Sequence, residues 1–118
     1  MSQGDWEGVE RDIVYTPEIF KAIQKDSWNF CAPNGESPKM VEERMLATMD
    51  KIINNESEGC IGIFCHAGSI RCLLRGILDF DPRMTFRLWI NNTSITQLNY
   101  DKRSGWHINC INDSFHIQ

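Results

Sequence analysis

The chain has 118 residues, of which 42% are hydrophobic and 24% charged, and its formal net charge is −4. This length suits one domain over residues 1–118, and the plentiful apolar residues exclude a disordered chain. The longest strongly apolar run, Cys60–Cys65, is far shorter than the ~18 residues of a membrane-spanning helix, so we expect no membrane partner. The acidic balance, without a cluster of Lys and Arg, argues against nucleic acid as a partner.

The cysteine pattern bears on cofactors and on location. An odd count without a C-x-x-C pair argues against a disulfide framework and against a zinc site, so we expect no cofactor. The first residues have neither the basic nor the apolar segment of a secretory signal. Reduced thiols and a cytoplasmic location are the resulting predictions. The five cysteines are Cys31, Cys60, Cys65, Cys72 and Cys110.

The first half of the chain predicts two helices. Residues 4–12 are rich in Gly, Asp and Glu and predict a loop. Thr16, followed by proline and an apolar stripe, predicts the cap of a short helix. After a turn at 34–36, Ser37 and the next proline repeat this signal, and recurring apolar residues predict a helix at about 38–54.

The second half combines helix and strand signals. The continuous apolar run 60–65 predicts a strand covered on both faces, as in a parallel sheet. A helix is expected at about 69–78, and clean alternation over 94–100 and 106–111 around a turn at 101–105 predicts a hairpin. This order indicates an α/β sandwich with helices packed on a mixed sheet.

The junction between the predicted strand and the next helix carries the most informative chemistry. Ligands of open α/β sheets bind beyond the carboxyl ends of strands, and a helix start offers free N–H groups to an anion. Ala67 and Gly68 are small enough for an anion to approach the backbone, and His66 would lie at the rim. Position alone leaves a structural role for His66 open. Ser69 is a cap candidate, and Cys65 is a poor partner for His66 because adjacent strand residues face opposite ways.

Other titratable residues admit two roles each. Arg71 would contact phosphate or form a salt bridge with Glu7 or Glu36. Glu7 and Asp5 would donate a proton beside a pocket, solvate their loop or pair with an arginine. Glu36 is predicted to be a capping residue, and Glu42 and Glu43 are predicted to lie on an exposed helix face. Structural or solvent-facing roles are expected for His107 and His116.

Five motifs in order resemble the C-terminal portion of the histidine phosphatase superfamily, the phosphoglycerate mutase-like enzymes. The likeness covers nearly all of the chain and is nearest to plant phosphoglycerate mutase-like phosphatases. Ala67 stands where the family commonly has Gly. The motifs are Gly4-Asp5-Trp6-Glu7-Gly8, Gly35-Glu36-Ser37, Cys65-His66-Ala67-Gly68-Ser69-Ile70-Arg71, Asn92-Thr93-Ser94-Ile95 and Asn112-Asp113.

The resemblance implies a three-layer α/β sandwich with a mixed sheet and phosphoryl transfer through a phosphohistidine. His66 matches a second histidine of the family, which clamps the phosphoryl group with two arginines. His66 is therefore the expected catalytic residue, and His66, Ala67, Gly68 and Arg71 are the expected contacts to a phosphorylated small molecule. Glu7 is the acid candidate. The resemblance implies no metal.

The chain departs from the family more seriously at the nucleophile, because no arginine in it is followed by histidine. The Arg-His-Gly nucleophile motif is thus absent, and the family's donor acid would precede Met1. We expect a partial domain that lacks its N-terminal strand and leaves 60–65 without a neighbour, completed by a second polypeptide or an oligomer.

Three functions fit these residues. The first is phosphomonoester hydrolysis with a nucleophile from outside the chain. The alternatives are a truncated, non-catalytic module that binds anions or a partner, and phosphoglycerate mutase activity in a complete parent protein. A thiol redox module is a weaker reading, and it requires a cysteine of lowered pKa.

Overall fold

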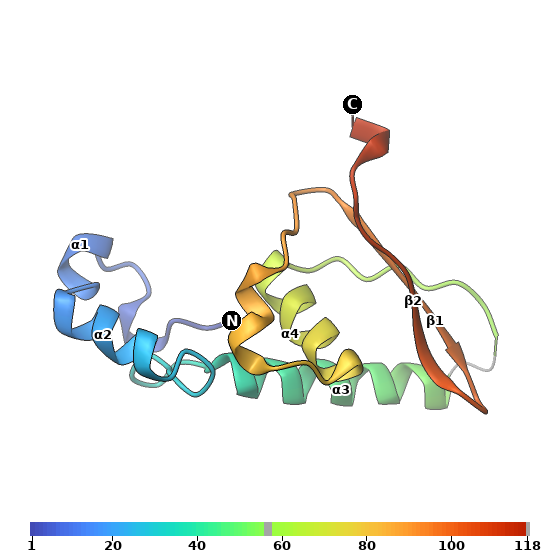
Figure 1. Ribbon diagram of the computed structural model, residues 1–118, viewed down its shortest axis with the longest axis horizontal. Helices are drawn as coiled ribbons and strands as arrows, with labels where there is room; N and C mark the ends of the chain where they lie inside the picture. The colour runs from blue at the N-terminus through green and yellow to red at the C-terminus, as the bar shows by residue number, and fades with distance from the viewer. Residues whose placement is uncertain (56–57, 118) are drawn as a thin grey trace.

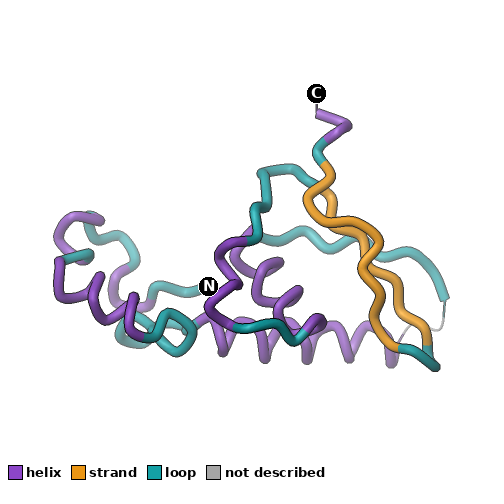
Figure 2. Tube along the Cα trace, viewed as in Figure 1, coloured by secondary structure: helices purple, strands orange, loops and turns teal. Residues whose placement is uncertain are grey.

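The computed structural model describes residues 1–55 and 58–117. A long helix, α3, runs lengthwise through the molecule (Figure 1), and a lobe of short helices lies at its N-terminal end. Helix α4 and a β-hairpin lie on one side of α3, as the trace in Figure 2 also shows. The elements are η1 (Gly4–Trp6), α1 (Arg11–Val14), α2 (Pro17–Lys25), α3 (Pro38–Asn55), α4 (Ala67–Leu78), η2 (Pro82–Arg87), β1 (Ile95–Asp101), β2 (Gly105–Asp113) and η3 (Phe115–Ile117).

Both predicted helix caps are confirmed. The Thr16 hydroxyl accepts a hydrogen bond from the Ile19 amide at 3.4 Å, and Ser37 Oγ accepts one from the Met40 amide at 3.2 Å. A proline occupies the first position of each helix, where its missing N–H has no partner to lose. Helix α3 ends at Asn55, within one residue of the expected end.

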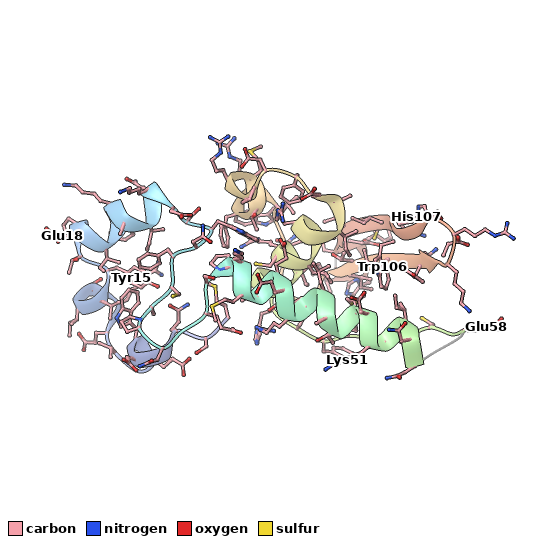
Figure 3. All side chains as sticks on the ribbon, turned by 90° about the horizontal axis from the view of Figure 1, so that it is seen from below. Tyr15, Glu18, Lys51, Glu58, Trp106 and His107 are labelled. Carbon is pink, nitrogen blue, oxygen red and sulfur yellow. The ribbon has the colours of Figure 1, made fainter. Side chains whose placement is uncertain are left out.

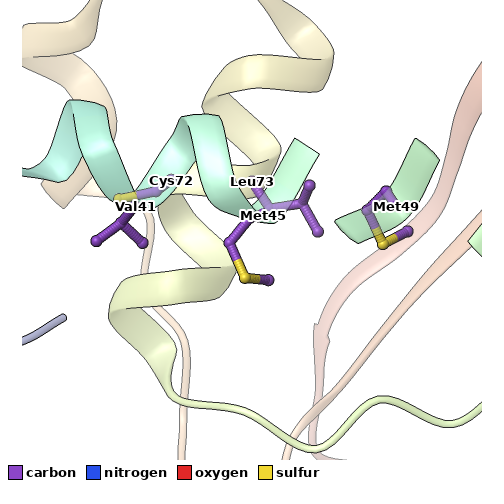
Figure 4. Packing of buried hydrophobic residues seen from close by; sticks show 5 residues of the cluster. All are labelled: Val41, Met45, Met49, Cys72 and Leu73. Atoms are coloured by element: carbon purple, nitrogen blue, oxygen red, sulfur yellow. The ribbon is translucent and has the colours of Figure 1, made fainter. Parts of the chain in front are cut away.

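The core lies between α3 and α4 (Figure 4). Val41, Met45 and Met49 recur every four residues and so share one face of α3, and they pack with Cys72 and Leu73 of α4. The hairpin adds Leu98 and Trp106 to this cluster, both half-buried. One apolar stripe on each helix thus holds the two helices and the hairpin together.

Close packing of the two helices depends on Gly76 in α4. A Cβ atom at this position would lie 2.8 Å from Leu46 Cδ1 and 3.0 Å from Glu42 Cγ, both on α3. These separations are shorter than a side chain tolerates without movement of its neighbours. Glycine therefore sets the distance at which α4 packs on α3.

Arg75 forms the polar part of the same interface. Its Nη1 donates to both carboxylate oxygens of Glu42 at 2.8 and 3.1 Å, and its Nε donates to the Phe80 carbonyl at 2.9 Å. Its Nη2 donates to Asp79 at 2.7 Å, and the guanidinium carbon lies 5.4 Å from the centre of the Trp28 ring. The sequence prediction of an exposed Glu42 is wrong, because this carboxylate is only 12% exposed.

The predicted hairpin is confirmed. β1 and β2 pair antiparallel, and the Tyr100 and Trp106 rings, which lie opposite each other, have centroids 5.0 Å apart. Asp101 Oδ1 accepts hydrogen bonds from the Arg103 and Ser104 amides at 2.8 and 3.1 Å, which closes the turn. Figure 3 shows Trp106 and His107 at the opposite end of the molecule from Tyr15 and Glu18 of the N-terminal lobe.

The expected strand at 60–65 is not formed. Within the described residues the sheet is two-stranded and consists of β1 and β2 alone. Residues 60–65 are not paired with a strand, and Phe64 is 100% exposed. A strand requires a neighbour for its N–H and C=O groups, so an apolar run of strand length is insufficient by itself.

Two smaller features also differ from the sequence predictions. The segment 4–12 contains η1 and the start of α1 in place of a continuous loop. Helix α4 begins at Ala67, two residues before the expected start at residue 69. None of the helices within 1–55 and 58–117 has the length and apolar character required to cross a membrane.

Candidate functional site

His66 is the residue from which α4 begins. Its backbone is extended, with φ −98° and ψ 155°, and its carbonyl accepts the first helical hydrogen bond from the Ile70 amide at 3.1 Å. The imidazole makes no capping hydrogen bond to the helix, and the residue is exposed. The ring is therefore accessible to a ligand from solvent.

The first turn of α4 presents backbone donors beside this ring. The amides of Ala67, Gly68 and Ser69 precede the first helical hydrogen bond, so the helix itself gives them no acceptor. A Cβ added to Gly68 would meet nothing within 4 Å, which leaves the space over this turn open. With the positive end of a twelve-residue helix, these amides can accept an anion.

Ser69 does not cap this helix, contrary to the sequence prediction. The helix begins two residues before it, so Ser69 lies inside the first turn and is buried. The capping position belongs to His66, whose side chain is left free of that role.

Arg71 anchors α4 to the segment that follows η2. Its Nε donates to the Leu88 carbonyl at 2.7 Å. It lies in the second turn of the helix, because α4 starts earlier than expected, and it pairs with neither of the carboxylates Glu7 and Glu36. The salt bridge considered for Arg71 from sequence is therefore wrong.

The segment after η2 is fixed at its other end by two asparagines. The Asn91 amide donates to Asn112 Oδ1 at 2.6 Å, and Asn91 Oδ1 accepts from the Trp89 indole at 2.7 Å. Asn112 has φ +60°, a left-handed conformation that asparagine tolerates better than most residues. Sequence reasoning did not assign this role to either residue, and the Asn-Asp pair at 112–113 was the one available signal.

The acid candidate Glu7 lies in the N-terminal lobe. Its Oε1 accepts hydrogen bonds from Ser2 Oγ at 2.9 Å and from the Gln3 amide at 3.0 Å, and neither of these residues belongs to α4. The Asp5 carboxylate accepts from Asn34 Nδ2 at 3.0 and 3.2 Å. Both carboxylates thus stabilise their own lobe and do not join the groups around His66.

Glu36 joins the lobe to α3. Its carboxylate accepts hydrogen bonds from Arg44 Nε at 2.6 Å and from the Ser2 amide at 2.9 Å. The Arg44 hydrogen bond, followed by that of the Ser2 amide, lowers the pKa of Glu36 below its ordinary value. Glu36 therefore forms an ion pair, while the capping role expected of it belongs to Ser37.

The environments of Cys65 and Cys72 oppose a thiol redox role for these two residues. Burial, with a contribution from the Glu42 charge, raises the pKa of Cys72 to about 11. Partial desolvation also raises the pKa of Cys65, the thiol next to His66. Because a reactive thiol requires a lowered pKa, neither cysteine fits that role.

The two remaining histidines have the surface positions expected of them. His107 is exposed, and its Nε2 lies 2.7 Å from Ser104 Oγ in the hairpin. His116 is exposed near the end of the chain. Neither belongs to the first turn of α4.

Two surface hollows of about 270 and 280 Å³ lie away from His66. Tyr15, Phe30 and Phe86 contribute to the first, and Lys25, Trp28 and Arg83 contribute to the second. In the described part of the chain, no three His, Cys, Asp or Glu side chains are grouped so that they could hold a metal ion. The chemistry available at His66 is thus imidazole and backbone N–H donation at an open surface.

Comparisons with known proteins give the family and the fold of the chain. The family described as "Histidine phosphatase superfamily (branch 1)" matches residues 1–114. The probable phosphoglycerate mutase GpmB of Yersinia enterocolitica is 28% identical over 89 residues, which are 72% of this chain and 41% of that protein. A crystal structure of a phosphoserine phosphatase mutant from Entamoeba histolytica, in complex with phosphoserine, matches with a TM-score of 0.68 at 18% identity.

The structural match covers 96% of this chain and 55% of the Entamoeba chain. It confirms the predicted α/β fold class, although the strand at 60–65 is not formed. The chain spans about two fifths of the curated relative and about half of the solved one.

Proposed function

The chain belongs to the histidine phosphatase superfamily, and from that premise we propose that it supplies the anion-holding part of a phosphoryl-transfer site at the start of α4. The observation that carries this proposal is the exposed His66 ring beside amides that have no helical acceptor. The reaction that we propose is phosphomonoester hydrolysis on a phosphorylated small molecule.

The proposed role of His66 is to donate a hydrogen bond to a phosphoryl oxygen. The amides of Ala67 and Gly68 would donate to the same group, where the helix end favours negative charge. These donors stabilise charge that builds up on the phosphoryl oxygens during transfer. Ala67 adds only a methyl group where the family commonly has Gly.

The nucleophile in this proposal comes from outside the 118 residues, since no arginine of the chain is followed by histidine. That histidine would attack phosphorus and displace the alcohol, and water would then release inorganic phosphate from it. His66 holds the phosphoryl group through both steps and forms no covalent bond.

Arg71 and Glu7 have secondary roles in the proposal. The Arg71 Nη groups would contact the substrate while its Nε stays on the Leu88 carbonyl. Glu7 is the proposed acid within this chain, and it would have to leave Ser2 Oγ and the Gln3 amide to reach a substrate at α4.

A second candidate is a non-catalytic module that binds anions or a partner, which the missing Arg-His pair and the unpaired segment 60–65 favour. Phosphoglycerate mutase activity in a complete parent protein is a third candidate, which the similarity to the Yersinia protein supports.

Titration of the chain with inorganic phosphate, followed by amide NMR, tests the proposal. We expect saturable shifts centred on Ala67 and Gly68, and we expect His66→Ala to weaken binding by about tenfold because one charge-assisted hydrogen bond is lost. His116→Ala is the matched control, since His116 is also exposed but lies outside α4. Absence of saturable shifts, or equal weakening by both variants, would contradict the proposal.

The same variants separate the candidate functions. Hydrolysis of p-nitrophenyl phosphate by the chain alone, abolished by His66→Ala, would exclude the non-catalytic candidate and also the need for an external nucleophile. Phosphate binding without turnover is the expected result for this chain by itself.

A further inference from the structure

Arg71 lies on the same face of α4 as the proposed anion site. Residues four apart in a helix share a face, and helical side chains lean toward the helix N-terminus, so Arg71 covers the turn that begins at Ala67. The residue is half-buried, and no carboxylate within 1–55 and 58–117 forms an ion pair with it. The direction of its guanidinium therefore depends on the hydrogen bond from Nε to the Leu88 carbonyl.

The segment 88–94, which offers this carbonyl, is held at few points. Apart from the Leu88 carbonyl, the described residues show one hydrogen bond between its backbone and another part of the chain, in which the Asn91 amide donates to Asn112 Oδ1 at 2.6 Å. Ile90 lies between these two points and is 6% exposed, which fixes the segment between them. Figure 1 shows the segment, in orange, between η2 and β1. The position of Leu88 thus depends on the bond that Asn112 makes three residues later.

A bulge in the hairpin orients Asn112. The pairing of β1 with β2 shifts between Ile95 and Leu98, so that two residues of β2, one of them Asn112, stand opposite Thr96. Asn112 has φ +60°, and its amide donates to Thr96 Oγ1 at 3.2 Å. A bulge of this kind can re-aim a side chain, and here Asn112 Oδ1 meets the Asn91 amide.

We propose that Asn112 is a positioning residue, which holds the segment 88–91 so that the Leu88 carbonyl keeps the Arg71 guanidinium over the first turn of α4. With Nε fixed, the two Nη groups keep the planar fork that binds an oxyanion with two parallel hydrogen bonds. The part that this arrangement plays in anion binding rests on the proposed function. The connection from Asn112 through Leu88 to Arg71 does not, and Asn112 itself contacts no anion.

Two variants of Asn112 separate its acceptor atom from its backbone conformation. Asn112→Gly keeps the left-handed conformation without strain and removes Oδ1. Asn112→Asp keeps an acceptor in the same place on a residue that also tolerates this conformation. Asn109→Ala is the matched control, because Asn109 lies in the same strand and is exposed. All three variants should keep the circular dichroism of the wild-type chain.

The first readout is the NMR signal of the Arg71 Nε–H group, identified by its loss in Arg71→Gln, and it requires no ligand. This proton should exchange slowly with water in the wild-type chain, since the Leu88 carbonyl accepts it at 2.7 Å. Asn112→Gly should make the exchange at least fivefold faster, whereas Asn112→Asp and Asn109→Ala should leave it within twofold. Unchanged exchange in Asn112→Gly, an equal effect of Asn109→Ala, or no rescue by Asn112→Asp would overturn the proposal.

The second readout is the dissociation constant for inorganic phosphate. Asn112→Gly should weaken binding about threefold in the wild-type background and leave it nearly unchanged in the Arg71→Gln background, because the residue acts through Arg71. Equal weakening in both backgrounds would contradict the positioning role. If the wild-type chain binds no phosphate, the proposed function fails, and the Arg71 signal alone decides whether Asn112 holds the guanidinium.

Discussion

At the scale of the residue, the interface between α3 and α4 depends on one arginine. Arg75 has its guanidinium bonded to Glu42, Asp79 and the Phe80 carbonyl, and its side chain is 15% exposed. Sequence alone could not assign this role, because Glu42 lies far from Arg75 along the chain and only the packing of the helices brings them together.

Arg75→Ala should lower the free energy of unfolding by about 2 kcal/mol, since it leaves the mostly buried Glu42 carboxylate without its partner. Urea unfolding checks this. Arg83→Ala is the control, because Arg83 pairs with Asp81 while 87% exposed and should change stability by less than about 0.5 kcal/mol. Equal effects would show that Arg75 is not a structural link.

Protonation of Glu36 at low pH should lower the free energy of unfolding. Its pKa is lowered in the folded chain, so its ion pair stabilises the fold above the ordinary value of 4.5 and loses this effect as the pH falls below it. Unfolding free energies measured from pH 6 to pH 3 should fall less steeply for Glu36→Gln than for wild type. Parallel curves would contradict this role of the carboxylate.

At the scale of the element, local signals were sufficient for the helices and the hairpin. Caps at Thr16 and Ser37, apolar periodicity and the turn at 101–105 all act within a few residues. The prediction of a strand at 60–65 was wrong, because strand formation depends on a neighbouring strand that no local sequence pattern supplies. His66 was expected at the end of that strand and lies instead directly before α4, and the contact from Arg71 to Leu88 was not predictable from spacing.

The contact of α4 with α3 can be tested at its closest point. Gly76→Ala gains about 1 kcal/mol of helix propensity but places a methyl group 2.8 Å from Leu46 Cδ1, and overpacking costs about 1–3 kcal/mol. We expect net destabilisation of about 1 kcal/mol in urea unfolding. Gly68→Ala, which meets open space, should be neutral or stabilising, and a stabilising Gly76→Ala would contradict the close approach.

The stability cost of truncating a methionine of α3 should depend on whether its side chain is buried in the core between the two helices. Met45→Ala, at a residue 8% exposed, should lower the free energy of unfolding by about 2–4 kcal/mol through the cavity that it leaves. Met40→Ala on the same helix, 47% exposed, should change it by less than about 0.5 kcal/mol. Thermal or urea denaturation of the two variants measures the difference. Equal losses of unfolding free energy would show that Met45 does not belong to the core.

At the scale of the whole molecule, the fold consists of a small core between two helices and a hairpin, with an exposed segment at 60–65. The exposed run 60–65 and the exposed His66 are consecutive in sequence, so this run leads directly to the proposed phosphate site. Membership of the histidine phosphatase superfamily rests on a match over residues 1–114, and the proposed phosphate contacts of His66, Ala67 and Gly68 lie at the start of α4.

A crystal structure of the 118-residue chain grown with tungstate, a phosphate analogue, tests the central claim most directly. The proposal predicts the oxyanion within hydrogen-bond distance of the His66 ring and of the Ala67 and Gly68 amides. An oxyanion bound at another site, with the start of α4 free of it, would contradict the claim.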